Sequence, residues 1–446
     1  MPSDRIADTR STARTADTGD AGDSAAPGAD TRAEFRTETG AARAGDAVRA
    51  LRRRRFRRSK PAWEAPGRPG KRRDALGSWC VHGLVVRGTL EGLHTFEAET
   101  GRPGWSWTVP RRGVLAAMSE RVVDGVGLVV HADEDDGRLT GITVTAFEVR
   151  SGDALWSFTP QFDDQQYYSE HSGPMAGLVA VVPGRAAVLS GRYLVARDLR
   201  SGQPVWAPAP APEGTVGRLA TDGSDFVQVV TAGGRATVRR IGAATGSTGR
   251  AVGVPFDGPA AEVHVAHQDP LVLLVEGKGP RAPEATLLVL DGGGEVTARI
   301  PAVGGHGELV LGRTGIGADR LVVATEEVVV VPTRPGPGAY DHLTAFARSG
   351  GGVRWTWRSK ERITGLFRVE GSVLVLSKWV APSGEADGTV HLHVLDGATG
   401  RVSAVRRLTT FQVGTEGRFH LDGDRLLRVS DWGHDTWAPV QMFRLR

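Results

Sequence analysis

One stretch of the sequence, residues 159–175 (TPQFDDQQYYSEHSGPM), gathers side chains that could bind a ligand. Its acidic, phenolic and imidazole groups could together contact a basic peptide or a small polar ligand. The candidate binding residues are Asp163, Asp164, Tyr167, Tyr168, Glu170 and His171. Loops on rigid scaffolds often carry function, although a solvated surface loop can have the same composition. We therefore predict a binding loop here and keep a plain surface loop as the alternative.

An acidic turn, HADEDDG at residues 131–137, matches a calcium-binding loop only in part. Such a loop needs oxygen ligands at alternate positions, a glycine turn and a bidentate glutamate further on. Asp133, Asp135 and Gly137 supply the beginning of that pattern and no more. We interpret the turn as a solvated hairpin tip.

Two pairs of histidines have the close spacing that can begin a metal site. His391 and His393 alternate on an expected strand, so both should point to one face. A zinc ion needs a third ligand from elsewhere, and no cysteine pair is present to supply it. His264 and His267 carry no stronger signal. We expect structural or surface histidines and no metal.

Catalytic signatures are missing from the sequence. It contains no Gly-x-Ser-x-Gly elbow, no His-Glu-x-x-His helix and no phosphate-binding loop. Cys80 is the single cysteine, which excludes an intramolecular disulfide, and we interpret it as a small strand hydrophobe. The opening residues lack a secretory signal, and no apolar run is long enough to span a bilayer. The expected location is the cytoplasm.

A basic segment, RALRRRRFRRSK, begins at Arg49 and ends at Lys60, with eight basic residues and no acidic one. The net charge of the chain is +4, so the rest carries 4 − 8 = −4. This arm could bind nucleic acid or anionic lipid by counterion release, and Phe56 could stack on a base. A simple solubilising tail is the alternative.

The sequence divides into a polar tail and a globular domain. Residues 1–58 hold few large apolar side chains and cannot offset the entropy cost of ordering, so we predict a disordered, Arg-rich tail. Residues 59–446 form the predicted domain. It is rich in short apolar runs and in glycine turns, which favour strands over helices.

A repeat runs through this domain, in which a strand-like run ends at a glycine and a tryptophan follows four residues later. The clearest pairs are Gly101 with Trp105, Gly152 with Trp156, and Gly202 with Trp206. Weaker copies end at Gly246, Gly293, Gly350 and Gly400, and only the Gly350 copy keeps tryptophans, at Trp355 and Trp357. The glycines lie 44 to 57 residues apart, which leaves room for four short strands in each unit. The pattern predicts an all-β propeller of four-stranded blades.

The two ends of the domain each hold part of a blade. The last strands before the C-terminus lack a final tryptophan-bearing strand, whereas Trp63 precedes the first full unit. Trp63 lies 22 residues before Val85, and Trp105 lies 23 residues before the corresponding Leu128. We predict that the segment around Trp63 completes the last blade, which hides the sheet edges. This gives eight blades, with seven as the alternative.

The repeat VTAFEVRSGDALW (144–156) and its copy LVARDLRSGQPVW (194–206) resemble the repeats of the pyrroloquinoline-quinone-type (PQQ-like) β-propeller family. The resemblance covers about residues 61–446 and implies radially packed blades. It also implies that each tryptophan docks near the turn glycine of a neighbouring blade. Kelch-type repeats share the period and remain a minor alternative, while the Trp-Asp repeats of WD propellers do not fit.

The resemblance also implies two classes of function. Some relatives are quinone-dependent dehydrogenases, with a disulfide of adjacent cysteines and a calcium held by Glu, Asn and Asp; this chain has one cysteine and no asparagine. Other relatives are non-catalytic scaffolds. We predict a monomeric, non-catalytic scaffold without a cofactor, which binds a protein or a small polar ligand. The alternatives are a quinone-dependent oxidoreductase and a propeller tethered to nucleic acid through its basic arm.

Overall fold

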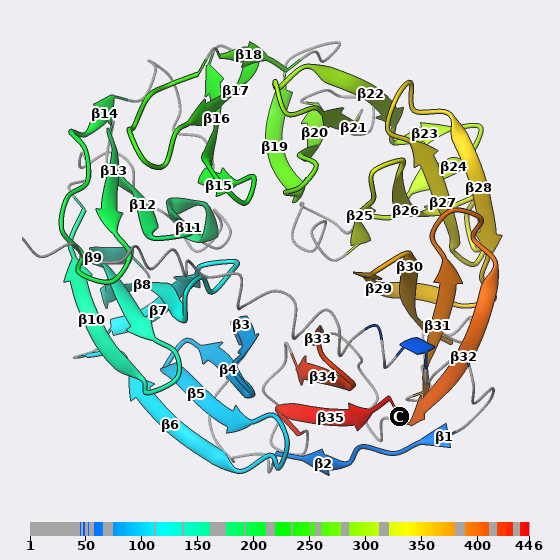
Figure 1. Ribbon diagram of the computed structural model, residues 1–446, viewed down its shortest axis with the longest axis horizontal. Coiled ribbons are helices and arrows are strands. Elements are labelled where there is room, and N and C mark those ends of the chain that lie inside the picture. The colour runs from blue at the N-terminus through cyan, green and yellow to red at the C-terminus, as the bar shows by residue number, and fades with distance from the viewer. Residues whose placement is uncertain are drawn as a thin grey trace, which may run out of the picture.

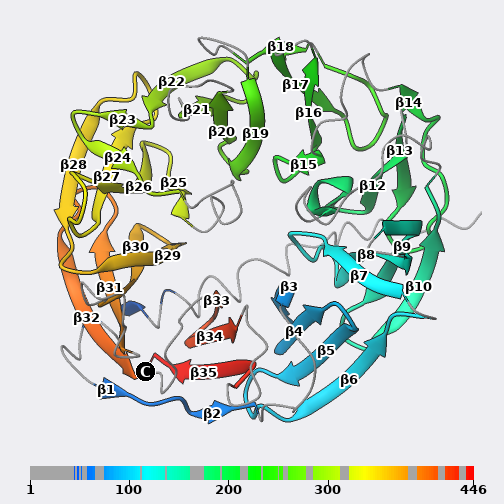
Figure 2. The same ribbon diagram turned by 180° about the vertical axis from the view of Figure 1, so that it is seen from behind.

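The computed structural model is a ring of eight β-sheets arranged as the blades of a propeller (Figures 1 and 2). In every blade but blade 6 the first strand lies near the axis and the last strand lies on the rim; in blade 6 the strand nearest the axis is β25 (Val323–Ala324). The structure describes residues 45, 48–49, 52, 58–65, 75–110, 113–135, 138–160, 175–190, 193–210, 219–232, 235–249, 251–254, 260–277, 285–311, 321–379, 389–409, 417–430 and 438–445. The prediction of an eight-bladed all-β propeller is confirmed, and the seven-bladed alternative is wrong.

The first four blades follow one another along the chain. Blade 1 consists of β3 (Ala75–Val81), β4 (Leu84–Thr89), β5 (Gly92–Glu97) and β6 (Pro103–Thr108). Blade 2 consists of β7 (Gly113–Met118), β8 (Val126–Asp135), β9 (Arg138–Glu148) and β10 (Asp153–Phe158). A 3-10 turn, η1 (Met175–Leu178), leads into blade 3, which consists of β11 (Val179–Val182), β12 (Arg185–Ser190), β13 (Tyr193–Asp198) and β14 (Ala209–Pro210). Blade 4 consists of β15 (Leu219–Thr221), β16 (Phe226–Ala232), β17 (Arg235–Ile241) and β18 (Val252–Gly253).

The remaining four blades include the two that receive N-terminal strands. Blade 5 consists of β19 (Ala260–His267), β20 (Val272–Gly277), β21 (Ala285–Leu290) and β22 (Val296–Pro301). Blade 6 consists of β23 (Val303–Gly304), β24 (Gly307–Leu309), β25 (Val323–Ala324), β26 (Val328–Arg334), β27 (His342–Ala347) and β28 (Val353–Arg358). Blade 7 consists of β29 (Arg362–Val369), β30 (Ser372–Lys378), β31 (Thr389–Asp396), β32 (Val402–Thr409) and β1 (Arg58–Ser59). Blade 8 consists of β33 (Gly417–Asp422), β34 (Arg425–Ser430), β35 (Val440–Arg444) and β2 (Trp63–Glu64).

Burial explains why inner and outer strands have different sequence patterns. The strand next to the innermost one is covered on both faces by the neighbouring blades, and β26 (VVVVPTR), which pairs with β25 and β27, accordingly has six of its seven residues buried. The rim strands β6 (PGWSWT) and β28 (VRWTWR) alternate between partly buried tryptophans and exposed residues. Within the described part of the chain, no helix is long and apolar enough to cross a membrane.

The tryptophan of one blade docks on the turn glycine of the next. The Trp105 indole N–H donates to the Val149 carbonyl at 3.0 Å, and a Cβ added to Gly152 would lie 2.5 Å from its ring. This is the contact that the repeat resemblance implies. The same geometry recurs for Trp63 on Gly101, Trp156 on Gly202, Trp206 on Gly246 and Trp355 on Gly400. These glycines have φ between 68° and 82°, which side-chain-bearing residues rarely adopt.

The ring is closed by the N-terminal strand β2, as the sequence predicts. Trp63 pairs antiparallel with Met442 of β35, and both views show β2 along the outer side of that strand. The Gln441 amide donates to Glu64 Oε1 at 2.6 Å and accepts from the buried Arg428 at 2.8 Å. An apolar cluster around Val85, Val429 and Met442 fills the junction of blades 1 and 8.

Several residues upstream of β2 also contact the propeller. Arg58 pairs in parallel with Arg407 of β32, which covers the rim edge of blade 7. Val48 is 4% exposed and belongs to a core cluster shared by blades 7 and 8. Arg52 donates to Ser372 Oγ at 2.8 Å. For the other residues of the tail, the predicted boundary between a disordered segment (1–58) and the domain (59–446) stays a prediction.

The strand order gives the propeller two different faces. Connections from the first to the second strand, and from the third to the fourth, leave from one end of each blade; we call this end the short-turn face. The remaining connections, including those between blades, leave from the opposite end, which we call the loop face. β10 ends and β11 begins at the loop face, on the path between blades 2 and 3.

Candidate functional site

The binding loop predicted from the sequence is the first candidate site. Asp163, Asp164, Tyr167, Tyr168, Glu170 and His171 lie outside the described residues. In the acidic turn, Gly137 also lies outside them, while Asp133 is described and pairs with Gly113 in the β8–β7 ladder. Both sites stay predictions.

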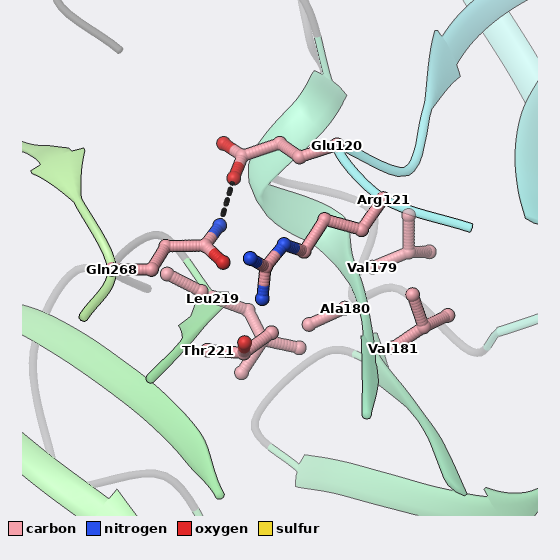
Figure 3. A pocket seen from close by; sticks show the side chains of 9 residues that line it. Glu120, Arg121, Val179, Ala180, Val181, Leu219, Thr221 and Gln268 are labelled. Atoms are coloured by element: carbon pink, nitrogen blue, oxygen red, sulfur yellow. Dashed lines mark hydrogen bonds between the residues drawn. The ribbon is translucent and has the colours of Figure 1, made fainter. Parts of the chain in front are cut away.

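A pocket lies near the axis, at the short-turn face, and residues from four blades line it (Figure 3). About 230 Å³ of space lies between these residues, and this volume includes open solvent. Its polar lining residues are Glu120, Arg121, Thr221 and Gln268, and its apolar lining residues are Val179, Ala180, Val181, Leu219 and Ala220. Glu120 and Arg121 come from the turn between β7 and β8, and Gln268 comes from the turn between β19 and β20. The walls belong to the innermost strands β11 and β15.

The polar groups of this pocket differ in whether they have hydrogen-bond partners. The Gln268 amide N–H donates to Glu120 Oε2 at 2.6 Å, which fixes the orientation of the amide because a carboxylate only accepts. The Gln268 carbonyl oxygen is buried and has no hydrogen-bond partner among the described residues. Within the same part of the chain, nothing pairs with the Arg121 guanidinium. Figure 3 shows Glu120, Arg121 and Gln268 converging over the aliphatic wall.

Groups around His267, which precedes Gln268, act on the pKa of its imidazole in both directions. Burial is the main cause that lowers the pKa of His267, and the charges of Arg368 and Arg121 lower it further. The Pro270 carbonyl, 3.0 Å from His267 Nδ1, opposes this effect. The charge of Asp269 also opposes it, but the pKa of His267 is lowered overall, so its imidazole is neutral at pH 7.

A second polar cluster lies in blade 7, at its loop-face end. His391 Nδ1 lies 2.6 Å from Glu361 Oε1, and Ser377 Oγ donates to Glu361 Oε2 at 2.5 Å. Ser377 Oγ also lies 3.0 Å from His393 Nε2. Since the serine proton goes to the carboxylate, His393 Nε2 must be the donor in that contact. Burial raises the pKa of Glu361, but the hydrogen bonds from His391 and Ser377 outweigh it and lower the pKa overall.

The two predicted histidine pairs are used in different ways. His391 and His393 point to one face of blade 7, with ring centroids 6.1 Å apart, and their hydrogen bonds go to Glu361 and Ser377. His264 is 1% exposed and lies 3.8 Å from Glu276. Across the described ranges, no group of three or more His, Cys, Asp or Glu residues could hold a metal ion.

The residues of the chain do not fit the quinone and calcium set that the resemblance implies for dehydrogenases. Cys80 lies in β3, among the residues of the blade 1–blade 8 junction, and it has no second cysteine to join. Burial is the main cause that raises its pKa, and the charge of Asp422 adds to it. The chain offers no asparagine side chain as a calcium ligand.

Sequence reasoning missed both polar clusters. Glu120 and Gln268 are 148 positions apart, in turns that carry no local motif, so only the closed ring brings them together. Ser377 faces His391 directly across the β30–β31 ladder, and the strand pattern could have suggested that pair. Glu361 joins Ser377 to His391, and nothing in the local sequence singles out this glutamate.

The fold defines the class of the protein as an eight-bladed β-propeller, and comparison with known proteins agrees with the repeat motif. Residues 82–269 match the family model described as outer membrane protein assembly factor BamB, a PQQ-like repeat family. The repeats within residues 82–269 match this family, which confirms the resemblance drawn from the sequence. Among the curated proteins, none matches the chain.

Solved structures of the same architecture are similar at low sequence identity. BamB from Moraxella catarrhalis is 14% identical with a TM-score of 0.49, and the alignment covers 86% of this chain and 99% of that one. A quinohemoprotein alcohol dehydrogenase from Pseudomonas putida HK5 is 14% identical with a TM-score of 0.50, covering 90% of this chain and 79% of that one. At this level of identity the likeness concerns the fold alone.

Proposed function

We propose that this chain is a non-catalytic PQQ-like propeller that holds a protein or a polar ligand on its loop face. The supporting observation is the direction of the hydrogen bonds in the blade 7 cluster. Ser377 is fully buried, and its proton is directed to Glu361 rather than to a histidine base. A nucleophilic serine needs the opposite arrangement, in which the hydroxyl is accessible and donates to the base. The cluster therefore stabilises blade 7 rather than attacking a substrate.

The loop face is the proposed binding surface because the inter-blade connections gather there. The connection between blades 2 and 3 carries the acidic and aromatic residues of the predicted loop, and a rigid ring is a suitable support for such a loop. Its composition suits a basic peptide, since carboxylates and phenols can together contact cationic side chains.

The experiment is a purification from the native host with the intact protein and a loop variant as baits. The variant replaces Asp163, Asp164, Tyr167 and Tyr168 with alanine. The control variant, Glu97→Ala with Arg102→Ala, removes an exposed ion pair on the short-turn face. A partner held by the intact and control proteins but lost by the loop variant supports the proposal. Equal recovery by all three places the partner elsewhere and overturns it.

Quinone-dependent oxidation is tested directly by titrating the purified protein with pyrroloquinoline quinone in a dye-linked dehydrogenase assay. We expect neither saturable quinone binding nor turnover above the level of free quinone. Tight binding with turnover of an alcohol would replace our proposal with the enzymatic alternative.

The nucleic-acid alternative is less favoured because part of the basic arm contacts the propeller. Arg49 lies 3.7 Å from Glu370, and Arg52 donates to Ser372. Binding of RNA that weakens steeply with salt and disappears when residues 1–57 are removed would revive this alternative.

A further inference from the structure

We infer that the loop-face ends of blades 6 and 7 form a binding surface for single-stranded nucleic acid. Exposed cations and exposed aromatic side chains meet there, and we call this set the basic–aromatic patch. Its members are Arg358, Lys360, Arg362, Tyr340 and Trp379. The patch lies on other blades than the loop predicted between blades 2 and 3, so it is independent of the partner proposed above.

A hydrogen bond and a strand pairing bring the members of the patch together across two blades. Asp341 Oδ2 accepts from the Ile363 backbone N–H at 2.9 Å, which joins the turn that holds Tyr340 to the first strand of blade 7. Arg362, the residue before Ile363, pairs with the last residue of β30, and Trp379 follows that residue. The patch is therefore one continuous surface.

The three cations of the patch lie at alternate positions on the connection between the blades. Arg358 ends β28, Lys360 follows it, and Arg362 begins β29. All three are exposed, whereas Ser359 is buried and Glu361 is half-buried between them. Among the residues that the structure describes, no hydrogen bond or ion pair binds any of the three cations. They are available to the phosphates of a partner.

The carboxylates at the same blade ends are held by other groups. Asp341 is 1% exposed and accepts from Nε and Nη2 of Arg334 at 3.0 and 2.7 Å. Glu361 is bound by the serine and the histidine of the blade 7 cluster. Glu308, the third described carboxylate at these ends, lies on β24, three strands away from β28 in the sheet of blade 6. Positive charge therefore prevails at the patch and favours an anionic partner.

The aromatic side chains indicate which anion fits the patch. Tyr340 is 42% exposed and Trp379 is 40% exposed, so both rings present a face to a partner. Exposed rings beside cations bind unpaired bases by stacking, while the cations bind the phosphates. A duplex keeps its base faces stacked inside, so it can use the cations alone. The patch therefore fits a single strand, with little preference for sequence.

Fluorescence anisotropy of a labelled oligothymidylate with the full-length protein tests this inference. Three phosphate contacts predict a slope of log affinity against log salt of about −2, so binding should be about twentyfold weaker at 200 mM than at 50 mM salt. The patch variant, Arg358→Ala with Lys360→Ala and Arg362→Ala, should bring the slope close to zero. Trp379→Ala should weaken binding at least about fivefold and leave the slope unchanged, because stacking releases no counterions.

Two controls match these changes. Tyr193→Ala removes an aromatic ring that is 50% exposed on the loop face of blade 3, and it should leave the affinity unchanged, whereas Tyr340→Ala should lower it. A full-length arm variant, Arg53→Ala with Arg54→Ala and Arg55→Ala, removes the same number of charges from the basic arm. It should change the slope less than the patch variant does. Thermal melting of each variant shows whether the fold is retained.

Absence of saturable binding to the oligonucleotide by the folded intact protein overturns the inference. A larger loss in the arm variant than in the patch variant also overturns it, because the arm would then be the site. Equal affinity for the single strand and for a duplex of the same length would reduce the patch to a general polyanion site. Binding to phosphatidylserine vesicles without binding to the oligonucleotide would identify a membrane surface instead.

Discussion

Trp63 lies against Gly101 of blade 1 while its backbone pairs with Met442 of blade 8, so one residue joins the two ends of the ring. The indole N–H donates to the Ala98 carbonyl at 3.1 Å. Among the residues that the structure describes, no other tryptophan of the repeat bridges segments so distant in the chain. The ring therefore depends on this contact more than on its equivalents.

Replacing Trp63 with alanine should destabilise the propeller by about 3 kcal/mol, the low end for truncating a buried aromatic residue, because Trp63 is only partly buried. Urea unfolding followed by circular dichroism measures the change. Trp379→Ala is the matched control, because this tryptophan is 40% exposed and should change stability by no more than about 0.5 kcal/mol. A similar loss in both variants would mean that Trp63 has no special role in closure.

Gly101→Ala should be more harmful than Gly184→Ala, although both glycines have nearly the same backbone conformation, with φ of 72° and 69°. At Gly184 a Cβ meets nothing within 4 Å, so the substitution adds only the left-handed strain of about 1–2 kcal/mol. At Gly101 a Cβ would lie 2.4 Å from the Trp63 ring, which adds about 1–3 kcal/mol of overpacking. The difference between the two free energies of unfolding measures the docking contact. Equal values would show that the indole can shift freely.

Because the imidazole of His393 is buried in its neutral form, the free energy of unfolding should decrease as the pH falls from about 6.5 to 4. Burial is the main cause that lowers its pKa from 6.5 to about 4, so the unfolded chain takes up a proton at higher pH than the folded one. The stability from burying the neutral ring is complete above pH 6.5 and is lost as the pH approaches the folded-state pKa, a change on the order of 3 kcal/mol. Urea midpoints of the intact protein and His393→Gln, measured at pH 7 and pH 4.5, reveal this contribution.

The control for the pH experiment is His82→Gln, at an exposed turn of blade 1. It should keep the pH dependence of the intact protein, whereas His393→Gln should reduce it. An unchanged slope in His393→Gln would show that this histidine does not sense pH.

Cys80 should report on opening of the junction between blades 1 and 8. Burial raises its pKa, so little thiolate is present in the folded protein, and its neighbours include the closure cluster around Val85 and Met442. Modification by a thiol reagent at pH 8 should be at least about tenfold slower in the native protein than in urea. Trp63→Ala should raise the native rate. A fast rate in the intact protein would mean that the junction is open.

The repeat made most of the fold predictable from sequence, and the exceptions have physical reasons. The motif is local, since a tryptophan four residues after a turn glycine places both groups on the rim, and its recurrence fixes the number of blades. The junction of blades 5 and 6 has no tryptophan; there Gly350 donates to the Thr297 carbonyl at 2.9 Å instead. In the preceding repeat the left-handed residue is Gly294, one position after the predicted Gly293.

The clusters that could bind or titrate were harder to predict, because ring closure rather than local sequence brings them together. Arg121 reaches the axial pocket from a turn without a motif, and the pairing of β1 with β32 involves a segment so rich in arginine that it shows no strand pattern. The sequence pattern also gave no sign that Val48 is buried between blades 7 and 8.

The pairing of β2 with β35 sets an order of events during synthesis. Trp63 leaves the ribosome 379 residues before its partner Met442, which corresponds to a delay of about 20–75 s at ordinary rates of translation. Throughout that interval the eighth blade does not exist, and the emerging arc of blades keeps two open edges. A chain that stops early cannot complete its circle, so any premature termination leaves a product that can pair with other chains through those edges.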